Sequence, residues 1–242
     1  MANSLNSKNR LIFALDVPDK TEAQRLVDLL NDSVGCFKVG LQLFIKEGPD
    51  ILKMVKDHSE ADIFLDLKLH DIPATVRNGL KSAEKLGVKY ITIHSTEGEA
   101  ILETSKEVKD SGLEVLAVTL LTSMGQEQLP GLGFKQDTKL NDLVIDRAWR
   151  AQKSGCAGVV CSGEEISQIK QKCGKNFKVV VPGIRPEWSQ INSDDQNRIA
   201  TPGKAIKAGA DLIVVGRPIR DANSPEEAAR KIVEEIDQYN NS

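Results

Sequence analysis

The sequence predicts an α/β protein, a single-domain (β/α)8 barrel that spans residues 1–242. Three observations lead to this prediction. Short β-branched runs alternate with longer amphipathic helical patterns along the whole chain. Strand–helix units of about 30 residues fit eight times into 242 residues, and roughly 250 residues are typical of this barrel. Most runs are continuously apolar, which is typical of parallel strands buried on both faces.

The predicted elements follow one another in regular order. The strands are residues 11–17, 36–41, 63–69, 90–94, 115–122, 158–161, 179–184 and 212–216. Clear helical patterns cover residues 21–30, 74–86, 140–153 and 225–239. Gly87 ends the second of these, and Ser224-Pro225-Glu226-Glu227 begins the last. Such alternation implies right-handed crossovers and a parallel sheet. An open doubly wound sheet is the alternative, although no GxGxxG follows the first strand.

Composition excludes several classes of function. A net charge of −3 and the pI of 5.8 disfavour nucleic-acid binding. The polar N-terminus lacks a signal sequence, and no apolar run approaches the roughly 18 residues of a membrane span. The 4 cysteines form no CxxC pair and the 3 histidines are scattered, so no zinc spacing appears. We expect a cytoplasmic protein with buried, reduced thiols and no nucleic-acid or membrane partner.

Charged residues interrupt the predicted strands at positions where a barrel should be apolar. Asp16 ends the first strand, Lys38 lies within the second, and Asp66 and Lys68 lie within the third. Because Asp66 and Lys68 are two residues apart, they are predicted to share the face that points into the barrel. Leu65, Leu67 and Leu69 are then predicted to face the helices. Asp71, just before Pro73, falls outside this alternation and is available to a neighbouring element or a second subunit.

A structural ion pair is one interpretation of these charges. However, the catalytic groups of such barrels lie at the carboxyl ends of the strands, where these residues are predicted. Each isolated buried ion costs several kcal/mol, so the charges must neutralise one another. Because buried ionic clusters stabilise weakly, we favour a functional site.

A phosphate site is predicted beside the last two strands. Gly216 would allow a backbone N–H to approach a phosphate, and Arg217 offers a bidentate guanidinium. A long polar segment, residues 186–201, follows the seventh strand and is interpreted as a lid. Arg185 and Gln196 in this region are candidate ligand-binding residues.

Residues 66–76, DLKLHDIPATV, resemble the DxKxxDIPxTV signature of the orotidine 5′-phosphate decarboxylase family. The resemblance extends to ALD at the end of the first predicted strand, and to FKVG, LTS, PGIR, DQ and VGR. DxKxxD alone is shared with sugar-phosphate decarboxylases and aldolases. The added IPxTV and Gln196 make the resemblance specific to the orotidine 5′-phosphate decarboxylase family. One departure is the segment that begins at His94, HSTEG in place of HAxGG. We interpret His94 as a structural barrel residue.

The resemblance implies a role for each matching residue. The implied catalytic array comprises Lys38, Asp66, Lys68 and Asp71. Asp71 and Thr75 would enter the partner's site in a homodimer. The substrate-binding residues implied for the ribose, pyrimidine and phosphate are Asp16, Lys38, Asp66, Thr75, Thr122, Ser123, Arg185, Gln196, Gly216 and Arg217.

The implied reaction is the decarboxylation of orotidine 5′-monophosphate to UMP, with Lys68 as the proton donor to C6. No cofactor and no metal are expected, because fixed charge would stabilise the carbanion. A magnesium-dependent sugar-phosphate decarboxylase or aldolase is the nearest alternative. A catalytically silent nucleotide-binding barrel is a second alternative, but it would not need Lys68 between two aspartates.

Overall fold

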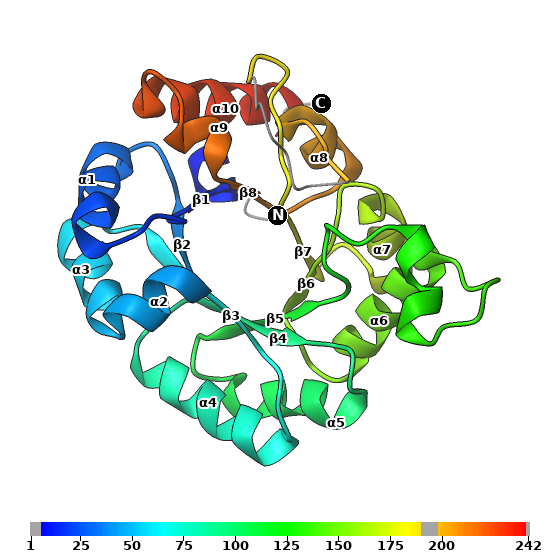
Figure 1. Cartoon of the computed structure of the whole chain (residues 1–242). Helices are drawn as coiled ribbons and strands as arrows, with labels where there is room; N and C mark the ends of the chain where they lie inside the picture. The colour runs from blue at the N-terminus through cyan, green and yellow to red at the C-terminus, as the bar shows by residue number, and fades with distance from the viewer. Residues whose placement is uncertain (1–5, 190–197, 241–242) are drawn as a thin grey trace.

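Eight parallel strands close into a barrel, and the helices form a ring around it (Figure 1). The computed structural model describes residues 6–189 and 198–240. Each strand pairs with the next, and the last pairs with the first. The predicted (β/α)8 fold is therefore confirmed and the open sheet is wrong. The strands are β1 (Leu11–Ala14), β2 (Cys36–Gly40), β3 (Asp62–Leu69), β4 (Tyr90–His94), β5 (Glu114–Val118), β6 (Gly158–Val160), β7 (Lys178–Val181) and β8 (Leu212–Val215).

The helices lie between consecutive strands, as the alternating pattern predicts. Their bounds are α1 (Lys20–Leu30), α2 (Leu41–Glu47), α3 (Asp50–His58), α4 (Pro73–Lys85), α5 (Glu99–Leu102), α6 (Leu140–Lys153), α7 (Ile166–Cys173), α8 (Pro202–Ala208), α9 (Arg217–Arg220) and α10 (Pro225–Asn240). The short 3-10 segments of the described residues are η1 (Ser7–Arg10), η2 (Glu103–Val108), η3 (Gln126–Gln128) and η4 (Pro130–Leu132). Within the described ranges, no helix is both long and apolar enough to cross a membrane.

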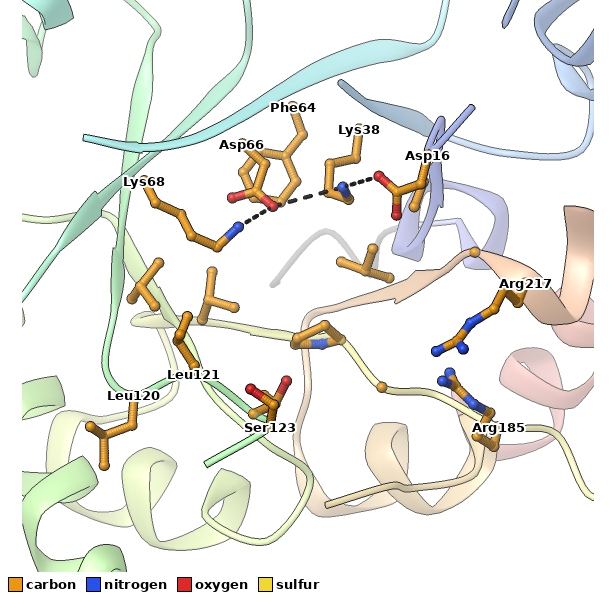
Figure 2. Close-up of a pocket in the computed structure, with 18 of the residues that line it drawn as sticks. Asp16, Lys38, Phe64, Asp66, Lys68, Leu120, Leu121, Ser123, Arg185 and Arg217 are labelled. Carbon is orange, nitrogen blue, oxygen red and sulfur yellow. Dashed lines mark hydrogen bonds and ion pairs between the residues drawn. The ribbon is translucent and has the colours of Figure 1, made fainter. Parts of the chain in front are cut away.

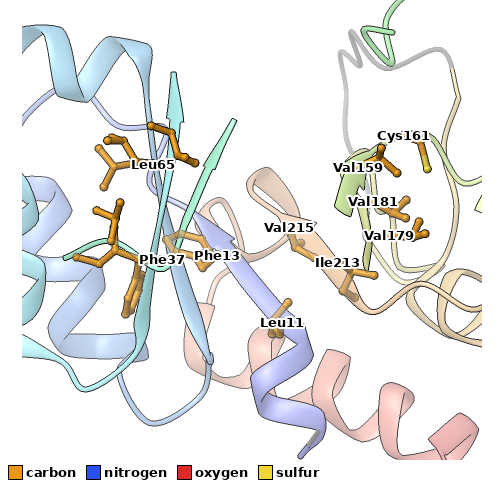
Figure 3. Packing of buried hydrophobic residues seen from close by; sticks show 14 of the residues in the cluster. Leu11, Phe13, Phe37, Leu65, Val159, Cys161, Val179, Val181, Ile213 and Val215 are labelled. Carbon is orange, nitrogen blue, oxygen red and sulfur yellow. The ribbon is translucent and has the colours of Figure 1, made fainter. Parts of the chain in front are cut away.

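Two apolar clusters fix the barrel, one on each side of its wall. The outer cluster fills the space between strands and helices and includes Phe13 and Phe37, whose rings meet edge to face at 6.3 Å (Figure 3). The inner cluster includes Ile12 and Phe64 and fills the barrel interior. Neighbours such as Ile12 and Phe13 enter opposite clusters because successive side chains of a strand alternate. The apolar interior forms a floor beneath the carboxyl ends of the strands.

Three strands end three or four residues earlier than the sequence predicts, and β2, β6 and β8 each end one residue earlier. β1 ends at Ala14, β5 at Val118 and β7 at Val181. The apolar runs continue because residues beyond the strands stay buried against the helices: Leu15 and Ile184 are both 0% exposed. An apolar run therefore marks burial, and it does not mark where ladder pairing ends. The residues past these ends form loops around the mouth of the barrel.

Candidate active site

A pocket of about 510 Å³ opens at the carboxyl ends of the strands. Apolar residues of the barrel interior, such as Phe64 and Val214, form part of its lining. Its charged and hydroxyl-bearing lining residues are Asp16, Lys38, Asp66, Lys68, Thr122, Ser123, Arg185, Arg217 and Arg220. The predicted site thus lies where catalytic groups of such barrels are found.

A line of alternating charges crosses one side of the pocket (Figure 2). Lys38 Nζ lies 2.9 Å from Asp16 Oδ1 and 3.8 Å from Asp66 Oδ2. Lys68 Nζ lies 2.8 Å from the same Asp66 oxygen. Lys38 and Asp66 are largely buried, with side chains 11% and 13% exposed. The predicted proximity of these residues is observed, and each buried charge has an opposite charge beside it.

Gly40, at the end of β2, leaves room for this line of charges. A Cβ atom there would lie 3.2 Å from both Asp16 Oδ1 and Lys38 Nζ. Such a contact is tighter than most Cβ atoms make. The FKVG segment therefore supplies both the lysine and the space beside it.

The Asp66 carboxylate is held in its ionised form. Burial opposes ionisation, but the attraction of Lys38 and Lys68 outweighs this effect, and hydrogen bonds from Lys68 and Thr92 add to it. The pKa of Asp66 consequently lies below its ordinary value. The site presents a buried carboxylate whose negative charge persists at neutral pH.

The strand that carries Asp66 and Lys68 is irregular at this point. Its register with β4 passes from Leu65↔Ile91 to Leu69↔Ile93, so three residues of β3 stand opposite one residue of β4. Lys68 has a φ of 51°, which is costly for a residue with a side chain, about 1–3 kcal/mol. Both Asp66 and Lys68 line the pocket, as predicted, while Leu67 and Leu69 pack against the outer cluster.

Thr92 is a site residue that the sequence reasoning missed. It is fully buried on β4 and is the residue that faces the irregular part of β3. Its hydroxyl accepts a hydrogen bond from the Lys68 backbone N–H at 2.8 Å and donates one to Asp66 Oδ1 at 2.9 Å. The available signal was a hydroxyl residue in the strand YITIH, at a position that alternation directs toward the barrel interior.

The loop after β5 brings Thr122 and Ser123 to the pocket, and Ser123 lies opposite the charged line in Figure 2. Buried Arg147 of α6 supports this loop, donating from Nη1 to the Thr119 carbonyl at 2.7 Å. Its guanidinium lies 5.9 Å from the centre of the Phe134 ring. Burial lowers the pKa of Arg147, while Asp146 and Glu97 act against that shift. Arg147 was also missed, because an arginine on an amphipathic helix resembles a solvated surface residue.

Arg185 and Arg217 enter the pocket away from Asp66 and Lys68. Their side chains point toward one another in Figure 2. Arg217 begins α9 directly after Gly216, which also lines the pocket. A Cβ at Gly216 would make an ordinary contact, 3.5 Å from the Ala14 Cβ. Packing within the protein therefore does not by itself require glycine at this position.

Asp71 and Thr75 do not join the pocket formed by this one chain. Both are exposed at the start of α4, where Asp71 Oδ1 accepts from the Ile72 N–H at 2.6 Å. Gln196 lies outside the described residues. Among the residues that are described, no group of three or more His, Cys, Asp or Glu side chains is arranged to hold a metal ion.

The segment that departs from the family pattern forms its own contacts. His94 at the end of β4 is half-buried, and its ring lies 5.1 Å from the ring of His70. Glu97 Oε1 lies 3.0 Å from His70 Nε2. Burial, together with the charges of His70, Lys68 and Arg147, lowers the pKa of His94. The unusual glutamate thus contacts a residue of the DLKLHDIP segment.

A barrel with a charged pocket at its strand ends has the architecture of the (β/α)8 enzymes. Residues 9–232 match the model of the orotidine 5′-phosphate decarboxylase / HUMPS family, and the chain belongs to this family. It is 44% identical over 234 residues to the orotidine 5′-phosphate decarboxylase of Desulfosudis oleivorans, covering 96% of this chain and 94% of that protein. It is also 44% identical over 231 residues to the orotidine 5′-phosphate decarboxylase of Gloeothece citriformis, covering 94% of this chain and 97% of that protein.

A solved structure supports the same relationship. The crystal structure of orotidine 5′-phosphate decarboxylase from Lactobacillus acidophilus superposes on this barrel with a TM-score of 0.81 at 34% identity. The alignment covers 93% of this chain and 98% of that chain.

Replacing Lys38 by methionine is expected to raise the pKa of Asp66, because it removes a major attraction that keeps this carboxylate ionised. A pKa lowered on folding stabilises the native state above the unfolded pKa, about 3.9 for Asp. That stability is lost as pH falls through the folded pKa. The variant should therefore be less stable than the wild type near pH 6, and it should lose less stability as pH falls below about 3.9, because the folded pKa of Asp66 no longer lies as far below the unfolded value.

Carboxyl-carbon NMR titration and urea unfolding across pH 2–6 would measure these two effects. Lys46→Met is the matched control, because Lys46 is half exposed and donates to the Pro18 carbonyl instead. An unchanged Asp66 titration in Lys38→Met would contradict the assigned pairing.

Proposed function

We propose that this protein decarboxylates orotidine 5′-monophosphate to UMP and CO₂, the final step of de novo UMP synthesis. The observation that carries the proposal is the Asp16–Lys38–Asp66–Lys68 line of charges in the barrel pocket. The relatives named orotidine 5′-phosphate decarboxylase support it. An ammonium group beside a buried carboxylate suits a reaction whose difficulty is the stabilisation of a carbanion.

Lys68 is proposed to act as the general acid. When the bond between C6 and the carboxylate breaks, CO₂ departs and the electron pair remains in an sp² orbital on C6. A positive charge fixed beside C6 stabilises this pair without reorganisation of the site. A proton then passes from Lys68 Nζ to C6, which completes UMP. Fixed charge thereby takes the place of an electron-accepting cofactor.

Asp66 is proposed to lie beside the substrate carboxylate. Repulsion between the two negative groups weakens in the transition state, because the charge moves onto the ring as CO₂ forms. The lowered pKa of Asp66 supports this role, since the repulsion requires an ionised carboxylate. Lys38, with its largely buried ammonium, would balance the charge and help to orient Lys68.

The remaining pocket residues are proposed to bind the nucleotide outside the reacting carbon. Asp16 and Lys38 would bind ribose hydroxyls, and Thr122 and Ser123 would contact the pyrimidine. The phosphate ligands are proposed to be Arg185, Gln196, Gly216 and Arg217. Gly216 lines the pocket although packing within the protein does not require glycine there, which supports this assignment, because glycine leaves the backbone accessible to a ligand.

A homodimer is proposed to complete the site. Asp71 and Thr75 are exposed at the same rim that carries the pocket, although neither lines it. Ile72 between them is 66% exposed, and Ile45 of neighbouring α2 is 77% exposed. Large apolar side chains left exposed on these two elements would suit an isologous interface. Asp71 of the partner subunit would then approach Lys68.

Lys68→Ala is expected to lower kcat for orotidylate by more than about 1,000-fold, because it removes both the proton donor and the adjacent positive charge. Orotidylate consumption followed by absorbance in the presence of EDTA measures this effect. Lys53→Ala is a control, since that side chain is 74% exposed. UMP binding should persist in the folded Lys68→Ala variant.

Near-normal kcat in Lys68→Ala would refute the general-acid assignment. Loss of wild-type activity with EDTA would instead favour the magnesium-dependent alternative.

Arg217→Ala should lower kcat/KM for orotidylate, because a charged hydrogen-bonding partner of the phosphate is lost. The loss should correspond to about 2–5 kcal/mol of transition-state stabilisation. The loss should be small for orotidine, which lacks the phosphate. Steady-state kinetics with both substrates checks the difference, and Arg230→Ala on α10 controls for the loss of a surface arginine. Equal losses for the two substrates would show that Arg217 does not bind phosphate.

Mixing Lys68→Ala chains with Asp71→Ala chains should restore activity. Each heterodimer contains one site with both residues intact, so a statistical mixture would recover about a quarter of the wild-type activity. Native mass spectrometry verifies the heterodimers, and each variant alone is the control. Verified heterodimers without activity would contradict a site shared between subunits.

A further inference from the structure

Thr92 places a hydroxyl group within the apolar interior of the barrel. Its neighbours on β4, Ile91 and Ile93, belong to the outer cluster, so alternation directs Thr92 inward. Tyr90, two residues earlier, belongs to the inner cluster. Thr92 is 0% exposed. A buried hydroxyl at this position requires partners, because an unpaired polar group is costly in an apolar setting.

The two partners of Thr92 are parts of the proposed catalytic pair. The Lys68 backbone N–H donates to Thr92 Oγ1 at 2.8 Å, and the hydroxyl in turn donates to Asp66 Oδ1 at 2.9 Å. This direction follows from chemistry, because an N–H group donates and an ionised carboxylate accepts. The hydroxyl is therefore used as both acceptor and donor.

These bonds also determine how the Asp66 carboxylate is oriented. Its Oδ2 atom faces the two ammonium groups, at 2.8 Å from Lys68 Nζ and 3.8 Å from Lys38 Nζ. Its Oδ1 atom accepts from Thr92. With both oxygens engaged on different sides, rotation of the carboxylate would break at least one contact.

The irregular pairing of β3 explains why a side chain is needed here. Between Leu65↔Ile91 and Leu69↔Ile93, Thr92 is the single β4 residue opposite three residues of β3. Lys68 in this stretch has a φ of 51° and departs from strand geometry. Its N–H is bonded by the Thr92 side chain, which takes the place of a ladder carbonyl.

We propose that Thr92 is a positioning residue of the decarboxylation site, whose hydroxyl fixes the Asp66 carboxylate and the left-handed Lys68 backbone relative to each other. This inference rests on the proposed function. Thr92 acts through Asp66 and Lys68, and it is not among the residues that line the pocket. Its loss should therefore affect the chemical step more than binding of the nucleotide.

Thr92→Val tests the proposal, because valine keeps the side-chain shape and removes the hydroxyl. We expect kcat for orotidylate to fall about 10- to 100-fold, the effect of leaving a buried N–H and a buried carboxylate oxygen without this partner. KM should change by less than about threefold, since ribose and phosphate are bound by other residues. Thr92→Ser keeps the hydroxyl and should recover kcat to within about threefold of wild type.

A matched control and a second pair of variants make the test independent of folding. Thr104 is a buried threonine of η2, 2% exposed, whose hydroxyl donates to the Ile101 carbonyl. Thr104→Val removes a comparable buried hydrogen bond and should leave kcat unchanged. If Thr92→Val does not yield folded protein, Thr92→Ala is compared with Thr92→Ser, a pair that differs only in the hydroxyl.

The outcomes separate the inference from the proposed function. An active wild type whose kcat falls in Thr92→Val and recovers in Thr92→Ser supports the positioning role. Equal kcat with and without the hydroxyl would overturn it, and so would equal impairment of the serine and valine variants. A wild type that does not consume orotidylate would overturn the proposed function, and the inference with it.

Discussion

Mutual neutralisation of charges inside the barrel is the constraint on which the site depends. Lys38 and Asp66 are too deeply buried to be stable as isolated ions, and each lies within 4 Å of an opposite charge. Their pairing stabilises the fold only weakly, because removing both groups from water offsets most of the attraction. The stability that keeps them in place comes from the apolar clusters on either side of the barrel wall. The fold thus maintains a charged site that does not stabilise itself.

The barrel and the inward direction of its charges were predictable from the sequence for the same physical reason. Parallel strands covered on both faces must be apolar, so Asp66 and Lys68 stood out within β3. Alternation placed them together in the pocket, and the structure confirms this. The ends of β1 and β7 were not predictable, because Leu15 and Ile184 remain buried after ladder pairing has stopped.

The irregularity in β3 could not be predicted from local pattern. Alternation counts residues along one strand, whereas the three-to-one pairing depends on how β3 meets β4. The same limit applies to Thr92 and Arg147, whose partners lie 24 and 28 residues away in the chain. Alternation can direct a threonine into the barrel, but neither such a threonine nor an arginine on an amphipathic helix identifies its distant partner. The roles of Thr92 and Arg147 become visible only when the fold brings these distant partners into hydrogen-bonding contact.

Arg185 and Arg217 lie apart from the charged line in the pocket (Figure 2), and this separation has a chemical consequence. Ion pairs hold the Asp16–Lys38–Asp66–Lys68 line together on one side of the pocket, and Arg185 and Arg217 lie on another side (Figure 2). Binding energy gained at a remote phosphate would offset the repulsion that Asp66 is proposed to exert on the substrate carboxylate. Such compensation requires that Asp66 does not rotate away when substrate binds. The rigidity of that carboxylate, with one oxygen toward the lysines and the other on Thr92, is therefore what would convert nucleotide binding into rate.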